Sequence, residues 1–225
     1  MKFLKPFLLS IAAGICIGIG GTLNIICNAN DLKVLGGILF SIGLFLICLF
    51  GFKLFTGQVG YLFSKENKLA FLGQLGIFYL GNLIGAVGLG FLLRLCLSDE
   101  YLSVGEALAN HKLVDLGRGV GGQPWYSMII LSIFCGMLVF FAVEIFRREK
   151  VHAFLRFAGL VCAISAFVIC GFEHCIADMF YFGFAGTWTS TTVLETLISV
   201  LCGSSGNIIG AFAAYGLTKL VDLKV

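Results

Sequence analysis

Charged side chains are scarce in this chain of 225 residues. Asp, Glu, Lys and Arg make up 12% of the sequence and hydrophobic residues 59%, whereas soluble domains contain roughly 25% charged residues. This shortage excludes an ordinary soluble protein and indicates an integral membrane protein. The sequence also lacks a Cys-x-x-Cys pair and any cofactor fingerprint. We therefore predict buried, reduced cysteines, no metal and no cofactor, and the net charge of +3 suggests no nucleic-acid partner.

Long apolar stretches are abundant instead. Six of them are long enough to cross a hydrocarbon core of about 30 Å, and they are too long and too uniformly apolar for the strands of a membrane barrel. The first follows two lysines without a convincing small-residue cleavage site, so we interpret it as a retained helix rather than a signal peptide. The sequence thus predicts one all-α transmembrane domain over residues 1–225. The stretches cover 7–27, 35–63, 69–97, 126–146, 154–184 and 193–217.

A short motif occurs twice. Gly-Asn-Leu-Ile-Gly-Ala at 81–86 recurs as Gly-Asn-Ile-Ile-Gly-Ala at 206–211, which predicts two related halves, about 1–98 and 125–219. Because each half has three helices, the second half enters the membrane in the opposite orientation, and such inverted repeats place a substrate path between them. The repeated amides, Asn82 and Asn207, must find hydrogen-bond partners in lipid.

The second and fifth apolar stretches each contain an interruption. Glycines with Lys53 and Thr56 interrupt the second, and Glu173, His174 and Asp178 interrupt the fifth. Ionisable groups at membrane depth usually face a cavity, a partner or a pore, so we predict broken helices here. His174 is predicted to line a transport path, with a structural bond to backbone carbonyls as the alternative. Glu173 is predicted to support the break by pairing with a backbone N–H or a hydroxyl.

The distribution of basic residues predicts the orientation. With both termini cytoplasmic, ten of the 15 Lys and Arg residues lie on the inner side and four on the outer side, as the positive-inside rule requires. Lys53 belongs to neither set, because it lies within the second stretch.

Four motifs, in order, resemble the formate/nitrite transporter family. They are Leu-Phe-Thr-Gly at 54–57, Gly-Asn-Leu-Ile-Gly-Ala at 81–86, Gly-Phe-Glu-His at 171–174 and Gly-Asn-Ile-Ile-Gly at 206–210. The resemblance covers almost the whole chain. It implies an aquaporin-like fold with broken second and fifth helices, a homopentamer in the bacterial inner membrane, and one anion path through each protomer.

The resemblance also implies which residues line that path. One constriction would contain Leu54 and Phe55 with Val139 nearby, the other Phe40, Leu44 and Phe167, and His174 would face the path between them with Thr56 within reach. From the residues alone, such Leu and Phe side chains are ordinary core. Apolar rings select monovalent ions because shedding water is so costly for multiply charged ones. An imidazole, with a reference pKa of about 6.5, can offer a hydrogen bond or a proton.

Several residues depart from the family pattern. Gly136 stands where many members have asparagine, so we expect the pore to lose an amide and gain room there, as in the hydrosulfide channel branch. Lys112 resembles a family lysine before the fourth helix. Asp178 and Lys53 carry opposite charges at the two helix breaks, so they either pair or extend to separate surfaces.

We therefore predict a channel that exchanges small monovalent anions across the bilayer. Hydrosulfide ranks first, formate second and nitrite third, with chloride as a further test anion. The main alternative is a proton-coupled carrier of formate or nitrite that uses the same residues. A membrane enzyme is disfavoured because no nucleophile motif occurs. A water or glycerol pore lacks its Asn-Pro-Ala turns, since Pro6 and Pro124 are the only prolines.

Overall fold

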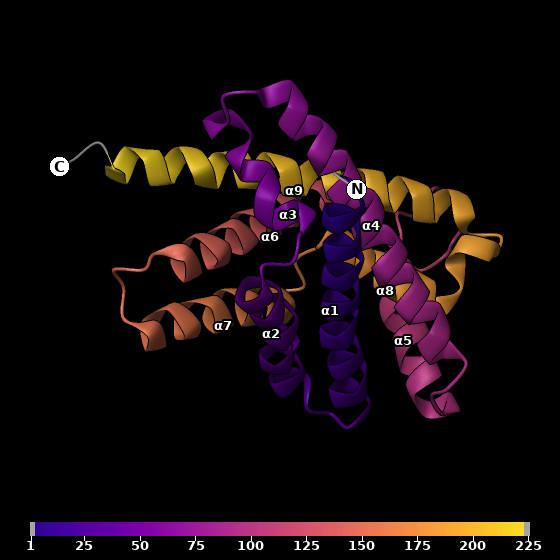
Figure 1. Ribbon diagram of the computed structural model, residues 1–225. Helices are drawn as coiled ribbons and strands as arrows, with labels where there is room; N and C mark the ends of the chain where they lie inside the picture. Colours follow the sequence, from indigo (N-terminus) through magenta and orange to yellow (C-terminus); the bar gives the residue numbers. More distant parts are fainter. Residues whose placement is uncertain (1–2, 223–225) are drawn as a thin grey trace.

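The computed structural model describes residues 3–222, and within that range it is helical without a named strand. Lys2 and Lys224, two of the residues used to predict the orientation, lie outside it. The all-α prediction is confirmed. The elements, labelled as in Figure 1, are α1 (Leu4–Ala29), α2 (Lys33–Phe50), α3 (Phe55–Val59), η1 (Gly60–Ser64), α4 (Lys68–Arg94), α5 (Asp99–His111), α6 (Trp125–Arg147), α7 (Ala153–Ile169), α8 (Cys175–Ala185), η2 (Thr187–Thr189) and α9 (Val193–Asp222).

Five helices, α1, α2, α4, α6 and α9, are long and apolar enough to cross a membrane, and α7 and α8 are shorter apolar helices. The two predicted interruptions are confirmed. The stretch 35–63 divides into α2 followed by α3 and η1, and the stretch 154–184 divides into α7 and α8. The sequence did not predict α5, which lies in the connection between the halves.

Both breaks begin in the same way. Gly51 ends α2 with a φ of 70°, and Gly171 follows α7 with a φ of 68°. This left-handed conformation suits glycine, which has no Cβ to clash, and commonly ends a helix. The next residue in each case turns its N–H back: Phe52 donates to the Ile47 carbonyl at 3.0 Å, and Phe172 to the Phe167 carbonyl at 2.9 Å.

The two halves are also packed alike. In Figure 1, α1 lies between α2 and α4, and α6 lies beside α7 and α9. Small residues let the long helices of each half approach closely: Gly85 lies against the α1 backbone at Ile11, and Gly210 against the α6 backbone at Ile133. The halves meet where Tyr79 and Ser204, which are equivalent positions of the repeat, share a hydrogen bond of 2.9 Å.

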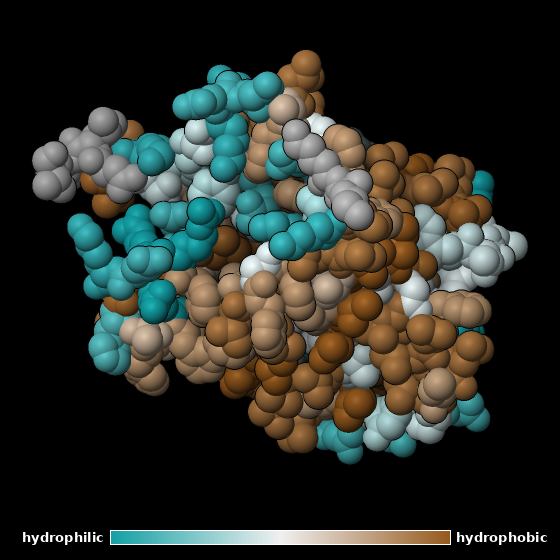
Figure 2. All heavy atoms as spheres, in the orientation of Figure 1, coloured by the Kyte–Doolittle hydropathy of each residue, from teal (hydrophilic) through white to brown (hydrophobic). Residues whose placement is uncertain are grey.

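The surface suits a lipid environment. Figure 2 shows a broad hydrophobic area between hydrophilic atoms at the upper left and at the lower and right edges. Many large apolar side chains on the surface are exposed, including Phe50, Leu69 and Leu201. Such a surface is unusual for a soluble monomer, and together with the five apolar helices it makes this a multi-pass membrane protein.

Candidate functional site

Asn82 on α4 closes the break between α2 and α3. Its side chain is fully buried, and its Oδ1 accepts a hydrogen bond from the N–H of Phe55 at 2.8 Å. Its Nδ2 donates to the carbonyl oxygens of Lys53 and Ser10, both at 2.8 Å. The broken helix leaves backbone groups without helical partners, and this amide provides them at membrane depth.

Asn207 on α9 does the same for the break between α7 and α8. Its Oδ1 accepts from the N–H of Cys175 at 2.9 Å, and its Nδ2 donates to the carbonyls of Glu173 at 2.9 Å and Ser132 at 2.8 Å. The two amides therefore hold equivalent backbone atoms. In each break they bond the residue before and the residue after one central position, which is Leu54 in the first break and His174 in the second.

His174 reaches across the interface of the halves to Thr56. The distance from His174 Nε2 to Thr56 Oγ1 is 2.8 Å, and both side chains are almost completely buried. The other ring nitrogen, Nδ1, accepts a hydrogen bond from the N–H of Ala177 at 3.2 Å. Because an acceptor nitrogen carries no proton, the ring is neutral in this arrangement and its Nε2–H donates to Thr56. The Thr56 hydroxyl hydrogen is then available for another acceptor.

Aromatic rings close the site on one side. Phe40 from α2 and Phe167 from α7 meet edge to face with ring centroids 5.5 Å apart, and Phe167 lies 5.9 Å from the imidazole of His174. Phe40 and Phe167 are nearly inaccessible to solvent. A small solute that reached His174 from this side would pass these rings, where it would lose water contacts.

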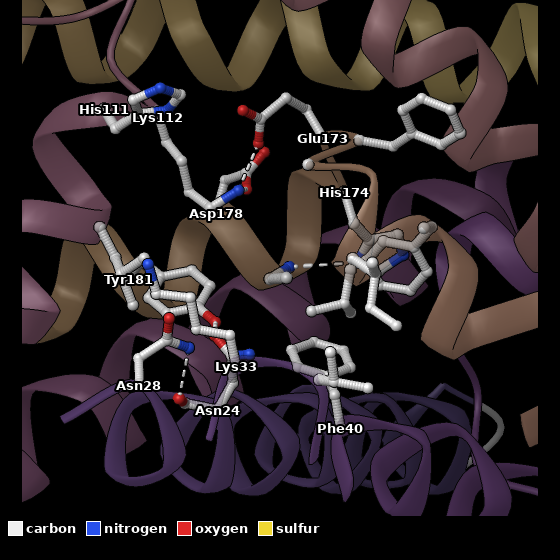
Figure 3. A pocket seen from close by; sticks show the side chains of 18 residues that line it. Asn24, Asn28, Lys33, Phe40, His111, Lys112, Glu173, His174, Asp178 and Tyr181 are labelled. Atoms are coloured by element: carbon white, nitrogen blue, oxygen red, sulfur yellow. Dashed lines mark hydrogen bonds and ion pairs between the residues drawn. The ribbon is translucent and has the colours of Figure 1, made fainter. Parts of the chain in front are cut away.

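A cavity of about 240 Å³ is lined by these two rings and by His174, and we call it the His174 cavity. Its walls combine apolar side chains with amides, a phenol and charged groups. Figure 3 shows Asn24, Asn28 and Lys33 together on one part of the wall, while Lys112 reaches toward the carboxyl groups on another. The Tyr181 hydroxyl donates to Asn24 Oδ1 at 2.9 Å. The cavity therefore offers both hydrogen-bond donors and ionic groups to a small polar solute.

Lys112 lies at the centre of a buried ionic cluster, in which its Nζ is 2.5 Å from Glu173 Oε2 and 3.3 Å from Asp178 Oδ1. Gln123 Nε2 donates to Glu173 Oε1 at 2.8 Å, so both oxygens of Glu173 accept hydrogen bonds. Burial by itself lowers the pKa of Lys112, but the adjacent carboxylates outweigh it, so this pKa is raised above its ordinary value. The lysine is a fixed positive charge.

A second cavity, of about 280 Å³, lies beside the other break, and we call it the Lys53 cavity. Its polar lining residues include Lys53, Gln58 and Arg147, and its apolar ones include Leu54 and Val143. Leu54 thus occupies the wall of one cavity and His174 the wall of the other. The hydrogen bond between Thr56 and His174 links α3, which follows the first break, to the centre of the second break.

The structure brings some of the predicted constriction residues to these cavities and not others. Leu54 lines the Lys53 cavity, and Phe40 and Phe167 line the His174 cavity. Three more predicted residues are buried but line neither cavity: Leu44, Phe55 and Val139. Phe55 packs against Tyr79 with ring centroids 5.0 Å apart.

Gly136 requires a correction. We expected it to leave room at the pore, but it faces the neighbouring helix: a Cβ added there would collide with the backbone carbonyl of Asn207. Gly14 stands in the equivalent place in the first half, where a Cβ would collide with the carbonyl of Asn82. Gly136 is therefore a close-packing position and not a missing amide in the path.

Two questions of pairing are also decided. Of the two alternatives for Lys53 and Asp178, pairing is excluded, because Lys53 lines its own cavity and Asp178 lies beside Lys112. The side chain of Glu173 pairs with an ammonium and an amide, not with a backbone N–H or a hydroxyl. The charges at the two breaks belong to separate cavities.

Sequence reasoning missed several residues of the site. Asn24 and Asn28 were a detectable signal, because two amides four positions apart in an apolar stretch lie on one helix face. The connection after α5 contains no pattern that predicts a site residue. It forms a loop that folds back on itself, and the N–H of Gln123 donates a hydrogen bond of 2.8 Å to the Leu113 carbonyl. This loop places Gln123 beside Glu173.

Comparison with known proteins gives a consistent result. A family model described as formate/nitrite transporter matches residues 1–221. The formate channel FocA of Escherichia coli (strain K12) is 31% identical, with 97% of this chain and 86% of the relative covered. The uncharacterized transporter YrhG of Bacillus subtilis (strain 168) is 32% identical over 84% of this chain and 71% of its own length. A solved structure of a pentameric formate channel with formate bound superimposes with a TM-score of 0.80 at 27% identity, covering 99% of this chain and 98% of that one.

Proposed function

The chain belongs to the formate/nitrite transporter family, and from this membership we propose that it is a channel for small monovalent anions. Its named relatives are channels and transporters, not enzymes. The observation that carries the proposal is the bond between Thr56 and His174, which lies between two polar cavities and beside apolar residues. A monovalent anion would leave the water of one cavity, meet the hydroxyl and imidazole, and enter the other.

The proposed path selects by the cost of dehydration. Leu54 on one side and the Phe40 and Phe167 rings on the other offer no polar groups to replace water, so a multiply charged ion would pay the full desolvation cost. A neutral His174 offers its N–H through Thr56 rather than a fixed charge. The base of a weak acid can accept a hydrogen bond from the Thr56 hydroxyl at this point, and a proton taken from the cavity water would let it cross the apolar part as a neutral molecule.

We rank formate as the first substrate and hydrosulfide as the second. The names of the relatives support formate. Hydrosulfide ranked first when Gly136 was taken as a missing amide, and the packing of Gly136 removes that support. Hydrosulfide stays a candidate because it is also a small monovalent base of a weak acid, and nitrite ranks third.

Assembly and orientation form part of the proposal. The similarity to a pentameric formate channel supports a homopentamer, and exposed apolar helix faces are available for subunit contacts or lipid. We propose the bacterial inner membrane with both termini cytoplasmic, from the excess of basic residues on that side. The Lys53 cavity would then open to the cytoplasm and the His174 cavity to the periplasm.

Single-channel recording tests the proposal. Purified protein in a planar bilayer should give resolved unitary currents when formate, hydrosulfide, nitrite and chloride are exchanged on one side. Slow, saturable uptake into liposomes together with a proton, without unitary events, would replace the channel with the carrier. The variant His174→Asn should leave the melting temperature nearly unchanged and alter conduction, since asparagine cannot accept and release a proton. Unchanged currents in it would remove His174 from the mechanism.

A further inference from the structure

The ionic cluster of the His174 cavity contains one cation for two carboxyl groups. Lys112 is the ammonium, and Glu173 and Asp178 are the acids. Asp178 lies on α8 and is 1% exposed, in a cavity that otherwise offers Lys33 and His111 at its wall. If both acids were ionised, the cluster would carry an uncompensated negative charge, and such a charge is costly to bury.

The two acids differ in their partners. Glu173 accepts hydrogen bonds at both oxygens, from Lys112 and Gln123, which is the arrangement that stabilises an ionised carboxylate. Neither oxygen of Asp178 has a hydrogen-bond donor, although one of them lies 3.3 Å from the Lys112 ammonium. Both carboxyl groups lie within 3.3 Å of the same Lys112 nitrogen. Two ionised carboxylates this close to one ammonium repel each other, and a proton on one of them relieves the repulsion.

Lys33 and His111 line the same cavity but are solvent-exposed, and among the described residues Lys112 is the cation that pairs with Asp178. The groups that face Asp178 are Lys112 from the end of α5, Glu173 from the break, Cys135 on α6, and Cys175 and Tyr181 on α8. A neutral thiol or phenol leaves the charge of the cluster unchanged, and further ionisation would make it more negative. A proton from the cavity water is the remaining way to neutralise the cluster.

We infer that the His174 cavity contains a proton-binding site, in which Asp178 holds one proton beside the ion pair of Lys112 and Glu173. With the proton bound, the cluster is neutral and the cavity admits an anion. When the proton leaves to water at higher pH, the cluster carries a charge of −1 and repels the permeant. The effect on anion flux rests on the proposed function, whereas the presence of the proton does not.

Asp178→Asn provides the test, because asparagine preserves the shape but removes the second acid, leaving Lys112 and Glu173 as a neutral pair. Asp115→Asn is the matched control, the same change at a partly exposed carboxylate on the same connection as Gln123. Formate flux into proteoliposomes is measured for the three proteins from acid to alkaline pH. The ratio of two fluxes at each pH cancels the titration of formate itself.

We expect the ratio of Asp178→Asn to wild type to be near one at low pH and to rise on the order of tenfold at high pH. This is the effect of one unit charge acting over a distance on the order of 10 Å at an effective dielectric constant of about 20. The ratio of Asp115→Asn to wild type should stay near one. A ratio for Asp178→Asn that does not change with pH would overturn the effect on the permeant.

Infrared spectroscopy of the reconstituted protein tests the proton directly. A protonated carboxyl group has a C=O stretching band that shifts in heavy water, and we expect this band in wild type and in Asp115→Asn. It should be lost in Asp178→Asn and also in Glu173→Gln, because the remaining acid would ionise opposite Lys112. A band that persists in both variants would refute the proton site. If wild type shows the band but no formate flux, the proposed function fails while the proton site stands.

Discussion

The two helix breaks share one backbone design and differ in the side chains placed on it. Each begins at a left-handed glycine, Gly51 or Gly171, and each is held by a buried asparagine that bonds the residues on either side of a central position. At that position stands Leu54 in the first half and His174 in the second. The preceding residue is Lys53 in the first, lining a cavity, and Glu173 in the second, paired in a buried cluster.

This comparison distinguishes the residues that hold the backbone of each break from the residues that give each break its chemical character. The amides satisfy backbone groups that any broken membrane helix exposes, so they are required in both halves. The central and preceding side chains are free to differ, and in this chain one break presents an apolar wall and the other a titratable group. Substitutions at equivalent places in the two halves test this separation, and we begin with those that should cost the most stability.

Replacing the clamp, by which we mean Asn82 or Asn207, should be the most damaging change. Asn207→Ala leaves the N–H of Cys175 and the carbonyls of Glu173 and Ser132 without their partner, and each buried unpaired group costs about 1–3 kcal/mol. We expect a large loss of monodisperse protein and of melting temperature in detergent. Asn82→Ala should be less severe, because no ionic cluster depends on the first break. Asn30→Ala is the control, since the amide of Asn30 is exposed and donates one bond within α1. Equal effects of all three would refute the clamp.

Removing the cation at each break should have very different effects on stability. Lys112→Met leaves Glu173 buried without its ammonium, which costs about 3–5 kcal/mol. Lys53→Met removes a cation that lines a cavity, so we expect a change of less than about 0.5 kcal/mol. Thermal unfolding followed by tryptophan fluorescence measures both variants. If the two lost the same stability, the charge at the second break would not be a buried structural pair.

The packing glycines should behave as equivalents. Gly136→Ala and Gly14→Ala each place a methyl group against the backbone of the clamp asparagine, and overpacking of this kind typically costs about 1–3 kcal/mol. We expect similar reductions in melting temperature for both, with Gly73→Ala as a control because a Cβ there meets nothing. Gly136→Asn should be destabilising rather than selective. A stable Gly136→Asn protein with changed anion preference would restore Gly136 to the path.

The smallest expected effect is the loss of formate flux on replacing Lys53. A cation in the wall of a cavity raises the local concentration of anions, so Lys53→Met should lower formate flux from that side about threefold and leave stability unchanged. The control is Lys65→Met, which removes an exposed cation stacked on Phe71. Flux measured separately from each side of oriented vesicles decides the matter. Equal reductions in the two directions at saturating formate would argue against capture by Lys53.

Much of the fold could be predicted because apolar length and its interruptions are local properties of the sequence. The six stretches and the two breaks follow from run lengths, glycines and ionisable residues. The helix α5 could not be found in that way, since 99–111 has an ordinary polar composition and no membrane-spanning length. Its position matters because it delivers Lys112 to the second break.

From residue patterns alone, the site was predictable where a residue acts on a neighbour in the chain. The distant contact between His174 and Thr56 was anticipated only through the resemblance to the family. Gly136 illustrates the limit: a glycine is compatible with an open wall or with a close helix crossing, and only the Asn207 backbone opposite it decides. The same holds for Asp178, whose partner Lys112 lies on another element. Which residues of two helices touch depends on how each helix is rotated about its own axis, and the pattern of residue types in one helix does not determine that rotation.

The clamps have a consequence for biosynthesis. Ser10, Lys53, Phe55 and Asn82 all belong to the first half, so the first break is complete before the ribosome has made the second. A half released early into the bilayer would already have this break's backbone paired, while side chains such as Thr56, Tyr79 and Asn24 would await their partners from the later half. Two separately translated fragments divided in the connection after α5 should therefore insert independently and assemble afterwards.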